Sequence, residues 1–155
     1  MTQEDKNILL KDLCARLPYG VKCYAYQFKI DGNDCECCGT LAGINNGYFH
    51  LSDRTPVNGG KTYNEHYLEV KPYLRLMSSM TEEERKEYES FFSIGEYSCG
   101  GSLYGEEYEY IADDYDDVTQ SVSLIDWLNA HHFDYRGLIP MELALEAPED
   151  MYKTE

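Results

Sequence analysis

Three segments with strand-like alternation follow one another in the first third of the chain, and short turn sequences separate them. In such segments large side chains occupy every second position, as expected for a strand with two different faces. The separating sequences Asp31-Gly32-Asn33-Asp34 and Asn46-Gly47 are typical of hairpin turns, because Asn, Asp and Gly tolerate a left-handed backbone. A fourth such segment comes later and is expected to end at Lys71-Pro72, after a loop over residues 52–64. The sequence therefore predicts an antiparallel meander whose strands cover residues 20–30, 35–44, 48–51 and 66–70.

Two helices are predicted from their starting residues. Thr2 and Asp5, like Thr81 and Glu84, have the spacing of a capping box, in which the two side chains satisfy free backbone N–H groups at a helix start. The first helix is expected to run to about Arg16, where Pro18 and Gly20 follow, and the second to about Phe92. The apolar side chains expected to face inward are Leu9, Leu10, Leu13 and Leu17 in the first helix, and Tyr88, Phe91 and Phe92 in the second.

The segment Ser123–Ile139 is predicted to anchor the core. It contains the only tryptophan, and Ser123 followed by Asp126 indicates a helix start. Gly137 and Pro140 are expected to end the segment. Its predicted anchor residues are Trp127, His131, His132 and Arg136.

Together these elements predict an α+β fold with an N-terminal helix, an antiparallel β-meander of three to five strands, and two further helices packed on one face. A chain of 155 residues can bury a core of its own, so a single domain covering 1–155 is expected. Residues 93–120 are interpreted as a variable acidic insertion. The tail is expected to fray from about residue 148.

The net charge of −16 is distributed unevenly along the chain. Residues 1–80 contain nine acidic and nine basic side chains, whereas residues 81–155 contain 20 acidic and four basic ones. A negative field of this size repels nucleic-acid backbones and anionic membranes, and it favours a basic partner. We therefore expect a basic protein partner, no direct nucleic-acid binding and no membrane binding; the sequence does not predict an oligomeric state.

The cysteines and histidines do not have the spacing of a metal site. The N-terminus lacks the basic and apolar regions of a signal peptide, so the protein is expected to be cytoplasmic, with free thiols. On a strand, Cys35 and Cys37 point to one face and Cys38 to the other, which prevents the three from binding one ion. The adjacent pair His131-His132 likewise lacks the spacing of two helical metal ligands. No metal, no cofactor and no catalytic residue is predicted.

Long phrases of the chain resemble a group of small uncharacterised proteins from gut Bacteroidales, often encoded in phages and other mobile elements. The phrases are VKPYLRLMSSMTEEERKEY (70–88) and DWLNAHHFDYRGLIPMELALEAPEDMY (126–152), together with LPYGV beginning at Leu17. The resemblance covers about two thirds of the chain and little of residues 93–120. It implies a family and a setting in mobile elements, and it implies no reaction.

The first functional hypothesis is a non-catalytic interaction protein that binds a basic protein surface. Carboxylates spaced along a surface can imitate a phosphate backbone, and tyrosines among them supply contact area. Such a protein could mimic nucleic acid or inhibit a host defence; the alternative is an acidic loop that only keeps the protein soluble. The predicted partner-binding residues are Glu106, Glu107, Glu109, Asp113, Asp114, Asp116 and Asp117.

The second hypothesis is a protein that binds or sequesters a small molecule or nucleotide. Tyrosines could stack on a base while cations hold a phosphate. The candidate residues come from the neutral half: Arg54, Lys71, Arg75, Tyr63, Tyr67 and Tyr73. An enzyme of unknown class is a third alternative.

Overall fold

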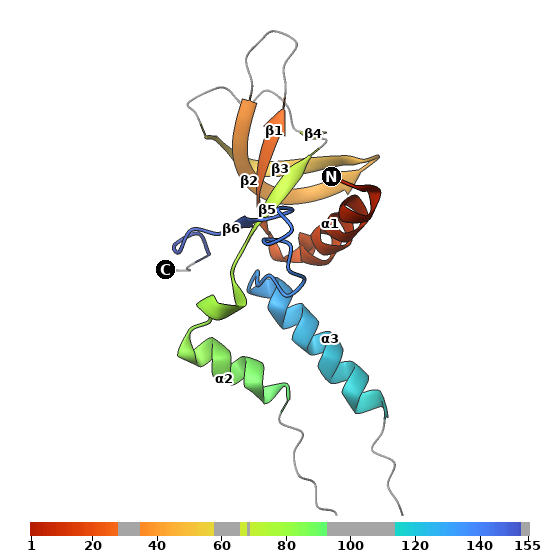
Figure 1. Cartoon of the computed structure of the whole chain (residues 1–155), viewed down its shortest axis with the longest axis vertical. Coiled ribbons are helices and arrows are strands. Elements are labelled where there is room, and N and C mark those ends of the chain that lie inside the picture. The colour runs from red at the N-terminus through yellow and green to blue at the C-terminus, as the bar shows by residue number, and fades with distance from the viewer. Residues whose placement is uncertain (28–34, 58–65, 68, 93–113, 153–155) are drawn as a thin grey trace, which may run out of the picture. The chain divides into compact units, whose positions relative to one another are not determined.

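The computed structural model describes residues 1–27, 35–57, 66–67, 69–92 and 114–152 (Figure 1). At residues 27, 35, 66 and 114–118 only the backbone is described. The chain divides into two compact units. The first, which we call the sheet unit, comprises Met1–Met77 and Leu128–Glu155; the second, the acidic unit, comprises Ser78–Trp127.

The sheet unit is built on a six-stranded sheet with the order β4-β3-β2-β1-β5-β6 (Figure 1). The pairs from β4 to β5 are antiparallel, and β6 pairs with β5 in parallel. The predicted α+β class, with its N-terminal helix and antiparallel meander, is confirmed. The antiparallel part has five strands, within the expected three to five, and the C-terminal segment adds β6 in parallel. The strands are β1 (Lys22–Gln27), β2 (Cys35–Asn45), β3 (Tyr48–Pro56), β4 (His66–Tyr67), β5 (Val70–Leu74) and β6 (Leu145–Glu146).

Helix α1 (Gln3–Arg16) begins with the predicted capping box. The Thr2 hydroxyl accepts from the Asp5 N–H at 3.1 Å, and the Asp5 carboxylate accepts from the Thr2 N–H at 2.7 Å. Leu9 and Leu13 are buried as expected, but Leu10 is 42 % exposed. The helix presents a narrower apolar stripe than predicted, because polar residues share its inner side. A 3₁₀ turn, η1 (Leu17–Tyr19), follows the helix.

The core lies on one face of the sheet. Alternation along β5 buries Val70, Pro72 and Leu74 and leaves the residues between them half-buried. In β1 the buried set is Cys23 and Ala25, so the tyrosines of that strand lie on the other face. The core residues come from α1, the residue before β1, five strands and the C-terminal segment: Leu9, Leu13, Val21, Cys23, Ala25, Cys37, Leu41, Leu51, Tyr67, Val70, Leu74, Leu138, Leu143 and Ala144.

The Asn46-Gly47 turn joins β2 and β3 as predicted, with φ of 49° and 78° at its two residues. The first predicted turn, residues 31–34, lies outside the described residues. Strand β3 continues to Pro56, so the loop expected from residue 52 begins later. Asp53 and Pro56 belong to residue types that favour turns, but here they lie in the final part of β3, which pairs with β2. The predicted start of the loop at residue 52 is therefore wrong.

The predicted strand over residues 66–70 is two strands, β4 and β5. Lys71 and Pro72 do not end the second strand, which continues to Leu74. Pro72 pairs with Cys23 of β1 within this strand. The short 3₁₀ turn η2 (Met77–Ser79) then leads out of the sheet unit.

The acidic unit contains α2 (Glu82–Ser90) and most of α3 (Asp114–Ala130). The capping box predicted for α2 is present, with Thr81 and Glu84 bonding reciprocally at 3.2 and 2.8 Å. The predicted helix start at Ser123 is wrong. Its hydroxyl donates to the Thr119 carbonyl at 2.9 Å within a helix that begins nine residues earlier, at Asp114. This is the back-bonding that serine makes in helix interiors.

Candidate functional site

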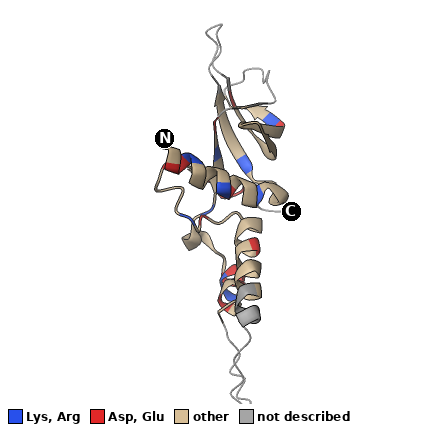
Figure 2. Cartoon of the chain, turned by 90° about the vertical axis from the view of Figure 1, so that its right-hand side faces the viewer, with Lys and Arg blue, Asp and Glu red and all other residues tan. Residues whose placement is uncertain are grey.

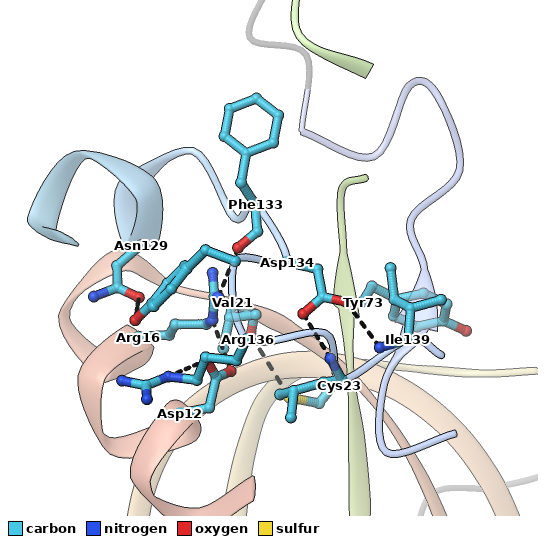
Figure 3. A network of polar contacts seen from close by, with 12 residues as sticks. Asp12, Arg16, Val21, Cys23, Tyr73, Asn129, Phe133, Asp134, Arg136 and Ile139 are labelled. Atoms are coloured by element: carbon cyan, nitrogen blue, oxygen red, sulfur yellow. Dashed lines mark hydrogen bonds and ion pairs between the residues drawn. The ribbon is translucent and has the colours of Figure 1, made fainter. Parts of the chain in front are cut away.

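A buried ion pair joins α1 to the C-terminal segment (Figure 3). Asp12 and Arg16 are both fully buried, and Arg16 Nε donates to Asp12 Oδ2 at 2.7 Å. Arg16 Nη2 also donates to the Phe133 carbonyl at 2.8 Å. Arg136 Nε lies 3.3 Å from the other carboxylate oxygen, and both guanidiniums lie over the Tyr135 ring. Two cations therefore share one carboxylate, which ties residues 133–136 to the helix.

A second buried carboxylate, Asp134, holds the turn that follows. Its two oxygens accept from the Leu138 and Ile139 N–H groups, each at 2.8 Å (Figure 3). Backbone N–H groups of this kind satisfy a buried carboxylate without a counter-ion. Asp12 and Asp134 are thus committed to the fold. Neither is placed to act as a general acid or base.

His132 is buried directly after α3, with a left-handed φ of 59°. Its ring stacks on Tyr152 with centroids 3.9 Å apart, and its Nδ1 has no hydrogen-bond partner. Burial, with the nearby charge of Arg16, lowers the pKa of His132 to about 4. His132 is not part of the helix, because α3 ends at Ala130. His131 is half-buried and stacks on Phe133.

Tyr152 closes the end of the β1–β5 pair. Its hydroxyl accepts from the Lys22 N–H at 3.0 Å and donates to the Tyr73 carbonyl at 2.8 Å. The hydroxyl thereby occupies the place of a ladder hydrogen bond where the two strands separate. Burial raises the pKa of Tyr152. The tail is therefore held as far as residue 152 and does not fray from residue 148 as predicted.

The predicted core anchor Trp127 is half-buried and lies outside the core cluster. In the acidic unit it packs against Tyr88 and Phe91, with ring centroids 6.3 and 6.2 Å away. Its Nε1–H donates to Glu87 Oε2 at 3.0 Å. The prediction failed because a lone tryptophan was assumed to mark the main core, whereas here it joins two helices. Arg136, also predicted as an anchor, has a side chain that is 34 % exposed.

The acidic unit holds most of the surplus charge. Residues 78–127 contain 14 acidic and two basic side chains, a net charge of −12, and the sheet unit contains 15 and 11, a net charge of −4. Among the predicted partner-binding residues, 106, 107, 109 and 113 lie outside the described residues. Asp114, Asp116 and Asp117 fall in the first turn of α3, where only the backbone is described, and not in the expected turn or loop.

Sequence reasoning overlooked the glutamates of α2 as candidates for binding (Figure 2, red). Acidic side chains favour a helix start, but this helix carries them along its whole length. The signal was present in the sequence, since 82–89 contains five glutamates and two cations. The exposed ones are Glu82, Glu83, Glu87 and Glu89.

Exposed apolar side chains accompany these acids. Phe92 is 57 % exposed, Val122 54 % and Ile125 42 %, so the expectation that Phe92 faces inward is wrong. Phe92 makes a T-shaped ring contact with Tyr88, with centroids 5.1 Å apart. Among side chains that the structure describes in 78–127, none is buried. The two helices expose apolar surface that their own contact does not cover.

The described residues of the ligand-binding alternative lie in different surroundings. Tyr67 is in the core, where its hydroxyl accepts from the Cys37 thiol at 3.0 Å, and burial raises its pKa to about 12. Lys71 and Tyr73 share the half-buried face of β5, whereas Arg75 lies over the Phe133 ring at 4.3 Å. Arg54 hydrogen-bonds the buried Tyr67, and Tyr63 lies outside the described residues.

The cysteines point as the strand period requires: Cys37 is buried and Cys38 half-buried on the opposite face. Cys14, Cys23, Cys37 and Cys38 are free thiols. Within the described ranges no three Cys, His, Asp or Glu side chains are grouped closely enough to hold a metal ion. No helix in those same ranges has the length and apolar character needed to cross a membrane.

Comparison with known proteins gives no relative from which a role could be transferred: no family model, no curated protein and no solved structure matches the chain.

Proposed function

We propose that the protein is a non-catalytic, cytoplasmic interaction protein whose acidic unit binds a basic surface of another protein. The observation that supports this most is that the surplus negative charge lies in one structural unit. A unit of 50 residues, Ser78–Trp127, carries −12 of the total −16. Uncompensated charge of one sign destabilises a compact unit through self-repulsion, and a cationic partner would remove that cost.

The disposition of the described acids is consistent with binding. Four glutamates of α2 are exposed, whereas the buried carboxylates of the sheet unit are neutralised by arginine or by backbone N–H groups. Exposed carboxylates on a helix are accessible to Lys or Arg of a partner. They would accelerate encounter with a basic protein and help to reject acidic ones.

The setting implied by the resemblance of 70–88 and 126–152 to phage-encoded proteins supports a target in the host. A basic nucleic-acid-binding protein is one class of target, since its groove already accepts closely spaced negative charge. For such a target we expect the acidic unit to compete with DNA or RNA for the same surface.

The test begins with the protein partner that co-purifies from the natural host. Its affinity for the purified full-length chain is then measured over a series of salt concentrations. We expect the affinity to fall at least about tenfold as the Debye length shrinks from about 10 Å at 0.1 M to about 3 Å at 1 M salt. An affinity that is unchanged across this series would refute an electrostatic interface.

Charge variants localise the effect. Replacing Glu83 and Glu89 of α2 by glutamine removes two exposed charges from the acidic unit. The matched control replaces Glu142 and Glu146, two exposed glutamates of the sheet unit. We expect the first pair to weaken binding several-fold and the second to leave it within about twofold. Equal effects of the two pairs would show that net charge, and not the acidic unit, determines binding.

A further inference from the structure

Helix α3 carries an apolar pair that the described chain leaves open to solvent. Val122 is 54 % and Ile125 42 % exposed, and the two lie three residues apart, on one side of the helix. Leu124 beside them is half-buried. Helices in folded proteins place such a stripe against another element.

The ring contacts between α2 and α3 are made by Trp127, which meets Tyr88 and Phe91. At roughly 100° per residue, Trp127 lies about 140° around the helix from Val122 and about 160° from Ile125. The exposed pair therefore points away from these ring contacts and is open to a further element.

The negative charge of the acidic unit limits which molecules could bind over Val122 and Ile125. A second copy of the chain would bring another unit of charge −12 against the first, and nucleic acid or an anionic membrane would be repelled in the same way. A basic helix meets both requirements, because one of its faces can be apolar while Lys and Arg flank it. Asp126, exposed on α3 beside the pair, and the glutamates of α2 provide the complementary charge.

We propose that α3 docks a basic amphipathic helix of the partner protein, which packs its apolar stripe on Val122 and Ile125. The proposal rests on the proposed function and specifies how the partner is held. Acidic side chains steer the encounter and set its salt dependence, and the apolar contact sets how long the complex lasts. The two contributions can be separated, since one governs association and the other dissociation.

The probe is a helical peptide of leucine and lysine about 18 residues long, with leucines at positions i, i+3, i+4 and i+7. A scrambled peptide of identical composition has the same charge and no apolar stripe. Binding of both to the full-length protein is followed by peptide fluorescence anisotropy at low salt. We expect the patterned peptide to bind at least about tenfold more tightly than the scrambled one.

Two double variants with matched exposure locate the contact. Val122→Ser with Ile125→Ser removes the proposed stripe, and Val57→Ser with Leu10→Ser removes side chains that are 50 % and 42 % exposed in the sheet unit. We expect the first variant to bind the patterned peptide as weakly as the scrambled one, mainly through faster dissociation. The second variant should bind like the unchanged protein. Circular dichroism of both variants checks that they remain folded.

The outcomes distinguish the two proposals. If both peptides bind equally and lose affinity with salt, the acidic unit still binds cations but helix docking is wrong. If the stripe variant retains tight binding of the patterned peptide, Val122 and Ile125 are not the contact. If sedimentation shows a dimer that the stripe variant abolishes, the occupant is a second copy and the proposal is overturned. Absence of binding by either peptide at low salt contradicts the proposed function as well.

Discussion

Acidification is expected to destabilise the sheet unit through one residue, His132. Its imidazole is buried, stacked on Tyr152, and close to the positive charges of Arg16 and Arg75. The folded state therefore holds the imidazole neutral, with a pKa of about 4, against 6.5 for the exposed group. Replacement of His132 by asparagine removes the titration. Asparagine also tolerates the left-handed φ of 59° at this position.

The sign and size follow from proton linkage. Between pH 6.5 and about 4 the unfolded chain binds a proton at this histidine that the folded chain does not, so stability falls as pH falls. Stability is complete above pH 6.5, and at about 1.4 kcal/mol per pKa unit the full loss is about 3 kcal/mol below pH 4. At about pH 5 roughly 2 kcal/mol should already be lost relative to pH 7.5.

The assay compares the pH dependence of unfolding in the unchanged protein and in His132→Asn. The only tryptophan lies in the acidic unit, so the sheet unit is followed by NMR signals of β1 and β5 amides during urea unfolding. Carboxylates titrate in both proteins, and the difference between the two isolates the histidine. Equal losses of stability between about pH 7.5 and 5, or an imidazole resonance of His132 that titrates near 6.5, would refute the reasoning.

Five other substitutions, two of them controls, test the packing of the sheet unit by chemical denaturation. Tyr152→Phe should cost about 1–3 kcal/mol, because it leaves an N–H of β1 and a carbonyl of β5 without their bridging hydroxyl; a neutral result would mean that water replaces it. Gly39→Ala should destabilise the protein by at least about 1 kcal/mol, because the added Cβ would lie 2.7 Å from a backbone oxygen of β3. Gly43→Ala is the control and should be tolerated, because the nearest atom to its added Cβ would be 3.8 Å away. Asp12→Asn should cost about 3–5 kcal/mol, because it leaves the buried Arg16 guanidinium uncompensated. Arg136→Ala should cost less than about 1 kcal/mol, since the Arg136 side chain contacts the same carboxylate but is partly exposed. Similar losses of stability in the two variants would contradict this difference in burial.

Local sequence patterns correctly predicted the elements that depend on residues close together in the chain. Both capping boxes, the Asn46-Gly47 turn and the antiparallel meander depend on neighbours within a few residues, and all are present. The errors occurred where a distant contact overrides local preference. Pro72 lies inside a strand because β1 and β6 flank it, and α3 begins at Asp114 although aspartates there favour a turn.

The polar network of the sheet unit could not be predicted, because its partners are far apart in sequence. Arg16 contacts the carbonyl of Phe133, 117 residues away, and the Tyr152 hydroxyl bonds Lys22, 130 residues away. No periodicity encodes such pairs. The uneven charge, in contrast, is a property of composition and was visible at once. What sequence lacked was the boundary at residues 78 and 127, which assigns that charge to one unit.

The two units use their charges differently, and this leads to a last prediction about salt. In the sheet unit buried carboxylates bind cations or N–H groups, so screening should change its stability little. In the acidic unit 14 acids face only two cations, and repulsion opposes the contact of Trp127 with α2. Added sodium chloride should therefore raise the unfolding midpoint seen by tryptophan fluorescence, while the β1 and β5 amide signals shift less. If salt lowers the tryptophan midpoint or shifts both units equally, the acids of the second unit are already neutralised within the chain, and they are not available for a basic partner.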